Sequence, residues 1–102
     1  MVVIGQDVLT AAGRKNTPVR KWLAEWLATA QQTDWHGLED VRRQYPSADG
    51  VKLASGTIVT VFDVKGNSYR LLTVIYFDAA TVEALEVITH AEYDKNLWKA
   101  RY

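Results

Sequence analysis

The fold of this chain is decided by residues 57–89, TIVTVFDVKGNSYRLLTVIYFDAATVEALEVIT. β-Branched and aromatic residues dominate this stretch, and two turn signals, Gly66-Asn67 and Asp78-Ala79-Ala80, divide it into apolar runs. We therefore predict an antiparallel meander of three strands: residues 57–64, 69–77 and 81–89. Few polar residues interrupt residues 71–77, so the middle strand is expected at the centre of the sheet.

The clearest helix lies upstream and begins at Thr17-Pro18, because threonine is a good N-cap and proline suits the first helical position. We expect it to end near Gln32. Its apolar residues recur at intervals of three and four, which places them on one buried face: Val19, Trp22, Leu23, Trp26, Leu27 and Ala30. Trp22 and Trp26 are interpreted as core residues rather than as a platform for stacking bases.

Shorter elements complete a prediction of the α+β class. Asp7 is expected to cap a short helix that stops near Gly13. The remaining elements are a helix over residues 37–44, an edge strand over residues 1–4 and a short strand over residues 51–53. We expect a single domain, residues 1–102, with the N-terminal helices packed on one face of the antiparallel sheet.

Composition excludes several kinds of site. The 102 residues contain no cysteine, which excludes disulfides and thiolate metal ligands, and the two histidines are far apart in sequence, so we expect no metal and no cofactor. Twelve basic and twelve acidic residues give a net charge of zero. Affinity for free RNA should therefore be weak and dependent on salt. Neither a signal peptide nor a membrane segment is expected, so we predict a cytoplasmic protein.

Ionisable side chains gather after the last predicted strand, in the sequence THAEYDK of residues 89–95. Loops held by a rigid sheet commonly present chemical groups in this way. Adjacent strands of a meander run in opposite directions, so the start of strand 69–77 should lie beside the end of strand 81–89. This places Arg70 near His90, with Lys65 across the hairpin from them.

Several separate motifs together resemble the HigB toxin family. The resemblance covers roughly residues 20–100, in which the motifs keep the family's order and spacing. They are TDW at residues 33–35, YPSAD at 45–49, VFDVKGNSYRL at 61–71, THAEYDK at 89–95 and WK at 98–99. The family belongs to the RelE-like toxins, which are small α+β proteins that cleave mRNA, commonly on the ribosome, and are neutralised by a helix-turn-helix antitoxin called HigA.

The resemblance implies an mRNA endonuclease that uses no metal and directs the RNA 2′-hydroxyl at the neighbouring phosphate. The residues that it implies for catalysis are Arg70, His90, Glu92, Tyr93 and Lys95. The residues expected to contact RNA are Lys65, Asn67, Tyr69, Asp94, Lys99 and Arg101. The implied partners are a HigA-type antitoxin, mRNA in the ribosomal A site and the 70S ribosome, with no membrane. We expect a toxin–antitoxin heterotetramer and a toxin that is monomeric alone.

Other interpretations of the same residues stay open. Arg70 could be an ordinary strand residue, His90 could bond a turn, and Tyr93 could simply pack. Thr89 and Glu92 match a capping box, which would give Glu92 a structural role. Lysines such as Lys65 and Lys95 are individually typical of solvated surface.

Two positions depart from the family pattern and motivate a second function. Asp63 stands where the family usually has asparagine, and Leu85 stands where it usually has arginine. The alternative is therefore an attenuated toxin that acts mainly as an antitoxin-binding co-repressor. A third possibility is an unrelated α+β module that uses its sheet for protein contacts.

Overall fold

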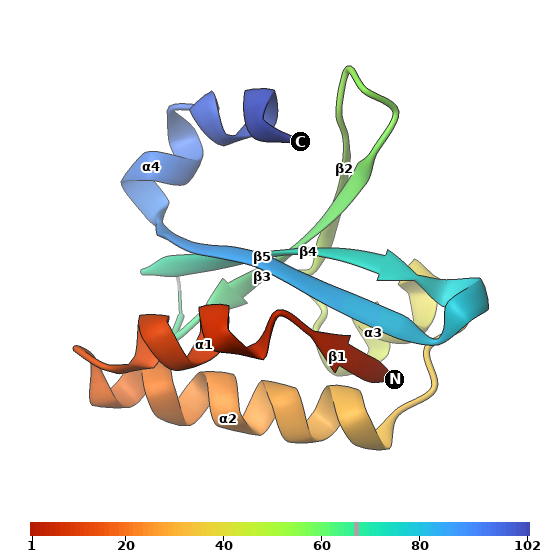
Figure 1. The fold of residues 1–102 in the computed structure, drawn as a ribbon, viewed down its shortest axis with the longest axis horizontal. Coiled ribbons are helices and arrows are strands. Elements are labelled where there is room, and N and C mark those ends of the chain that lie inside the picture. The colour runs from red at the N-terminus through yellow and green to blue at the C-terminus, as the bar shows by residue number, and fades with distance from the viewer. Residues whose placement is uncertain (67) are drawn as a thin grey trace.

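A five-stranded mixed sheet organises the computed structural model, which describes residues 1–66 and 68–102 (Figure 1). The strands lie in the order β1-β5-β4-β3-β2, so β4 is central as predicted. Their bounds are β1 Val2–Ile4, β2 Asp49–Lys52, β3 Ile58–Val64, β4 Tyr69–Tyr76 and β5 Thr81–Thr89. The α+β class is confirmed.

The predicted meander is confirmed for β3, β4 and β5, and β2 extends it as a further antiparallel strand. The predicted edge strand β1 pairs with β5 in parallel, from Val2 opposite Thr81 to Ile4 opposite Glu83, a direction that we did not predict. A three-residue strand carries no signal of its direction. The pairing places Val3 in the core while its two neighbours on β1 stay exposed.

Three helices precede the meander, and their bounds are α1 Gln6–Gly13, α2 Thr17–Gln32 and α3 Leu38–Gln44. Figure 1 shows α1 and α2 side by side along one face of the sheet. The apolar face of α2 is buried there at Leu23 and Trp26, while Trp22 and Leu27 are only partly buried. The predicted buried face of this helix is therefore confirmed. Its most completely buried residues recur at intervals of three and four: Val19, Leu23, Trp26 and Ala30.

The starts of α1 and α2 differ from prediction by one or two residues. The N-cap of α2 is Asn16, whose side-chain Oδ1 accepts a hydrogen bond from the Val19 amide at 3.1 Å. Asparagine is at least as good a cap as Thr17, which becomes the first helical residue. α1 begins directly after Gly5 rather than at Asp7.

Gly5 makes the tight connection from β1 to α1 possible. Its φ is 78°, and a Cβ placed on it would lie 2.5 Å from the carbonyl oxygen of Ala84. Only glycine tolerates both the left-handed backbone and this close approach. The connection sends the chain from the sheet directly into the helical layer.

The second face of the sheet is covered by the C-terminal segment. α4 (His90–Asp94) and the 3₁₀ helix η2 (Leu97–Arg101) lie on the opposite side of the sheet from α1 and α2 (Figure 1). Trp98, 1% exposed, belongs there to a buried cluster with residues of the meander and of the loop before β3: Leu53, Val59, Val61, Leu72 and Ile88. The prediction of helices on one face was therefore incomplete, because residues 90–101 are too short to give a helical periodicity.

The turn after β4 agrees more closely with its prediction. The expected turn after β4 is a short 3₁₀ helix, η1, Phe77–Ala79. None of the helices in residues 1–66 and 68–102 is both long and apolar enough to cross a membrane.

Candidate functional site

The candidate site lies on the sheet face that carries α4 and η2. Side chains alternate along β4, so Leu71 enters the core under α2, whereas Arg70 and Leu72 point to the opposite face. Arg70 lies opposite Asp63 on β3 and opposite Ile88 on β5. We call five residues on this face the Arg70 cluster: Asp63, Arg70, His90, Tyr93 and Asp94.

Arg70 is the centre of the cluster and is only 6% exposed. Its Nε lies 3.0 Å from Oδ1 of Asp63, and its Nη1 donates to the Tyr69 carbonyl oxygen at 3.1 Å. Its Nη2 lies 2.8 Å from Nδ1 of His90. All three guanidinium nitrogens therefore have partners within the fold, and the arginine is fixed in orientation. The predicted proximity of Arg70 and His90 is confirmed.

His90 is held between a cation and a carboxylate. A guanidinium can only donate hydrogen bonds, so Nδ1 of His90 must be the acceptor from Arg70. The ring is then neutral with its proton on Nε2, which lies 3.1 Å from Oδ2 of Asp94. The His90 amide also donates to the Ser68 carbonyl oxygen at 3.1 Å, which ties the end of β5 to the start of β4.

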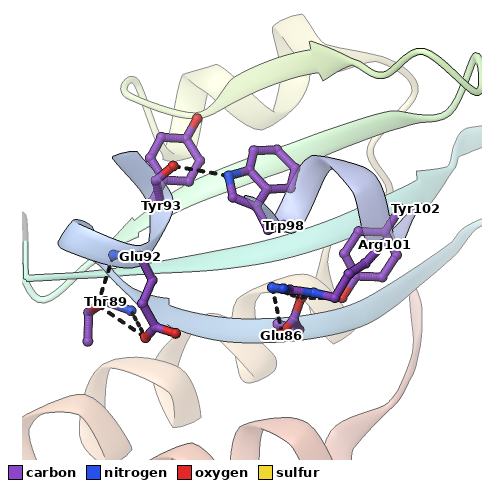
Figure 2. Close-up of polar contacts among 7 residues, drawn as sticks. All are labelled: Glu86, Thr89, Glu92, Tyr93, Trp98, Arg101 and Tyr102. Carbon is purple, nitrogen blue, oxygen red and sulfur yellow. Dashed lines mark hydrogen bonds and ion pairs between the residues drawn. The ribbon is translucent and has the colours of Figure 1, made fainter. Parts of the chain in front are cut away.

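Tyr93 forms the aromatic wall of the cluster. The Arg70 Cζ lies 5.4 Å from the Tyr93 ring centroid, which is a cation–π distance. The Tyr93 ring also stacks on Trp98, with ring centroids 5.4 Å apart and planes inclined by 15°. Figure 2 shows the indole Nε1 of Trp98 donating to the Tyr93 carbonyl oxygen, at 3.2 Å.

Burial raises the pKa of Tyr93, and the nearby carboxylate of Asp49 raises that pKa further. Arg70 opposes these effects, while Asp63 and Asp94 add to them. Tyr93 is therefore a phenol at neutral pH, able to donate a proton or a hydrogen bond. Three carboxylates and one guanidinium therefore act on the pKa of this ring.

Glu92 takes the structural role that its spacing from Thr89 indicated. The Glu92 amide donates to Thr89 Oγ1 at 3.1 Å, and the Thr89 amide donates to Glu92 Oε1 at 3.2 Å (Figure 2). These reciprocal bonds form the capping box at the start of α4. The carboxylate of Glu92 is therefore directed at Thr89 and holds the helix that carries Tyr93.

Two of the predicted RNA contacts lie on the side of the sheet that α1 and α2 cover, opposite the Arg70 cluster. Lys65, in the turn after β3 with a φ of 50°, lines a pocket with Trp22 and Glu25 of α2. Tyr69 packs against the core beneath α2, because it is the neighbour of Arg70 and points to the other face. The structure thus does not bring Lys65 or Tyr69 into the Arg70 cluster. Asn67 lies outside the described residues.

The C-terminal cations are arranged around η2. Lys95 is the exposed C-cap residue of α4, and Lys99 Nζ lies 5.9 Å from the ring centroid of Trp98. Arg101 makes two bonds to Glu86 on β5, at 2.9 Å and 3.0 Å (Figure 2). Tyr102 also donates to Glu86, and burial followed by this bond raises the pKa of Tyr102 to about 12. Arg101 therefore fixes η2 to the sheet.

Asp63 is the cluster member that we did not predict as a site residue. Asp63 and Arg70 flank the hairpin at matching distances from its turn, so an antiparallel register alone would have placed them opposite each other. Trp98 was likewise not expected to support the site. Among the described residues, no group of three or more acidic or histidine side chains could hold a metal ion.

Comparison with protein families identifies a match over most of the chain. A protein-family model, HigB_toxin, described as the RelE-like toxic component of a toxin–antitoxin system, matches residues 19–96. The matched segment includes α2 from its third residue, the whole meander and α4, and therefore all members of the Arg70 cluster. The comparison with curated proteins found no match.

Proposed function

This chain belongs to the HigB family of RelE-like toxins, and on that premise we propose that it is an mRNA endonuclease that acts on the ribosome. The family makes it the toxic component of a toxin–antitoxin system. One observation supports the activity above the others. A guanidinium fixed by the sheet lies beside both an imidazole and a protonated phenol, at 2.8 Å from the imidazole Nδ1. These are the groups that metal-free phosphoryl transfer requires.

In the proposed reaction, the RNA 2′-oxygen forms a bond to the neighbouring phosphorus and the bond from phosphorus to the 5′-oxygen breaks. The products are a 2′,3′-cyclic phosphate and a 5′-hydroxyl. Arg70 offers its planar donors to the phosphate oxygens, where charge develops in the transition state. Tyr93 is protonated at neutral pH and supplies a hydrogen bond or a proton to the leaving oxygen.

His90 is the proposed base, and its tautomer suggests how it becomes available. Nδ1 accepts from Arg70 in the free protein. When a phosphate oxygen replaces Nδ1 as the acceptor for Nη2 of Arg70, Nδ1 is released to take the proton of the 2′-hydroxyl. Asp94 then stabilises the imidazolium through Nε2, at 3.1 Å in the free protein. In this proposal Glu92 supports α4, and Lys95 contacts RNA from the exposed end of that helix.

The partners follow from the family and from the charge. A net charge of zero gives little non-specific affinity for RNA, so we propose that the 70S ribosome presents the mRNA in its A site. The family implies an antitoxin partner. We propose an antitoxin of the HigA type with a helix-turn-helix domain, a heterotetrameric complex, a monomeric free toxin and action in the cytoplasm.

The test is cleavage of mRNA on purified, programmed ribosomes. We expect cleavage that persists in EDTA, and that is lost when the attacking ribose carries a 2′-deoxy or 2′-O-methyl group. Arg70→Ala and Tyr93→Phe should each lower the single-turnover rate by about 10²-fold. Arg43→Ala, which removes an exposed arginine of α3 paired with Asp40, is the matched control and should cleave normally. Near-normal cleavage by folded Arg70→Ala protein would contradict this placement of the active site.

A second function is favoured by the surroundings of Arg70. Asp63 pairs with the guanidinium, and Leu85 lies on the apolar core beneath η2 rather than adding a cation. A toxin with such a site could act mainly by binding its antitoxin and adjusting repression of their operon. Normal growth at high expression, together with antitoxin-dependent repression that Arg70→Ala does not change, would favour this second function.

A further inference from the structure

Asp63 pairs with the guanidinium that a substrate phosphate would bind in the proposed reaction. Its Oδ1 lies 3.0 Å from Nε of Arg70, and its side chain is 30% exposed, whereas that of Arg70 is 8% exposed. The carboxylate is therefore more accessible to solvent than the guanidinium. A phosphate that forms two parallel bonds to Arg70 must compete with this resident anion.

The charge around the cluster makes that competition costly. Asp49, Asp63 and Asp94 all act on Tyr93 as negative charges, and Arg70 is the cation that opposes them. Two cations of the C-terminal segment have other contacts, because Arg101 is paired with Glu86 and Lys99 lies over Trp98, while Lys95 is exposed at the end of α4. Negative charges close to a binding site lower the affinity of that site for an anion.

We propose that Asp63 has two separable effects on this site: its oxygen positions Arg70, and its charge opposes the binding of RNA phosphate. The inference rests on the proposed function, because it concerns the same guanidinium. Asp63 is a positioning residue, since it acts on the substrate through Arg70. Removal of its charge with retention of its oxygen should tighten RNA binding without slowing the chemical step.

The variant that separates the two effects is Asp63→Asn. An asparagine Oδ1 still accepts from Nε of Arg70 but carries no charge. Asp63→Ala removes both the charge and the acceptor. The matched control is Asp78→Asn, which makes the same change of charge in η1, at the opposite end of β4 from Arg70. Asp78 is exposed. Thermal unfolding of every variant should precede the binding measurements.

The first measurement is fluorescence anisotropy with a labelled RNA hexanucleotide that cannot be cleaved because each ribose is 2′-O-methylated. Asp63→Asn and Asp63→Ala should both bind about tenfold more tightly than the unchanged protein, which corresponds to about 1.4 kcal/mol. Asp78→Asn should bind as the unchanged protein does. The gain should shrink as salt is raised, because it is electrostatic.

The second measurement is steady-state cleavage on programmed ribosomes. Asp63→Asn should lower KM about tenfold at constant kcat, whereas Asp63→Ala should lower kcat because Arg70 loses its support. An Asp63→Asn protein that binds the hexanucleotide no better than the unchanged protein, or no better than Asp78→Asn, would overturn the inference even if ribosomal cleavage is observed. Tighter binding by Asp63→Asn without cleavage by any variant would instead refute the proposed function and leave the inference standing.

Discussion

Trp98 offers the sharpest test of how the C-terminal segment is held on the sheet. Its indole is 1% exposed and packs against Leu72, Ile88 and their neighbours while stacking on Tyr93. Truncation of a buried tryptophan to alanine costs about 3–5 kcal/mol. We expect Trp98→Ala to fall in the upper half of that range, because the ring pair and the bond from Nε1 to the Tyr93 carbonyl oxygen are lost together.

The loss should be measured by urea unfolding followed by far-ultraviolet circular dichroism. A protein of this size has a total stability of about 5–15 kcal/mol, so Trp98→Ala should be severely weakened. Trp98→Phe keeps an aromatic ring and should lose much less. A loss below about 1 kcal/mol for Trp98→Ala, with an unchanged slope against urea, would show that the C-terminal segment does not depend on this contact. The packing attributed to η2 would then be wrong.

Four further variants test single contacts. Thr89→Ala should lower the free energy of unfolding by about 1 kcal/mol through loss of the capping box, and urea unfolding should find most of it restored in Thr89→Ser. Gly5→Ala should cost about 1–3 kcal/mol in the same assay, because the left-handed φ and the Ala84 carbonyl oxygen both oppose a Cβ. The pKa of Tyr102 is raised from 10 to about 12 in the folded state, so its contribution to stability is complete below pH 10 and is lost as the pH rises towards 12. Absorbance titration of tyrosinate should lose its highest step in Tyr102→Phe; retention of that step would assign it elsewhere. Arg70→Lys keeps the charge but cannot bond Asp63 and His90 together, so its single-turnover cleavage should fall by about 10²-fold, and an unchanged rate would mean that the planar fork is not needed.

The sequence was most informative where local chemistry determines structure. The strong helical period of residues 17–32 predicted α2 and its buried face, and the capping box between Thr89 and Glu92 was legible from spacing alone. The proximity of Arg70 to His90 followed from the order of antiparallel strands. Each of these depends on contacts between residues that are near in sequence or on neighbouring strands.

The remaining features depend on tertiary packing. The direction of β1 is set by the turn at Gly5 and by burial of Val3, which no three-residue pattern encodes. The C-terminal segment lies on the sheet face opposite α1 and α2, because Trp98 packs there against an apolar surface. That surface is made by residues distant in sequence. Lys65 was expected near the cluster because hairpin neighbours are close, but its side chain lies with α2.

The parallel pairing of β1 with β5 also affects the order in which the molecule can assemble. Val2 cannot meet Thr81 until the meander has been synthesised, so the first strand made is completed by one of the last. Contacts between residues so far apart in sequence form late, and they lower the rate of folding. The Arg70 cluster has the same dependence, since Tyr93 and its support from Trp98 come at the end of the chain. A nascent chain therefore lacks an assembled cluster until residues 93–98 have been synthesised.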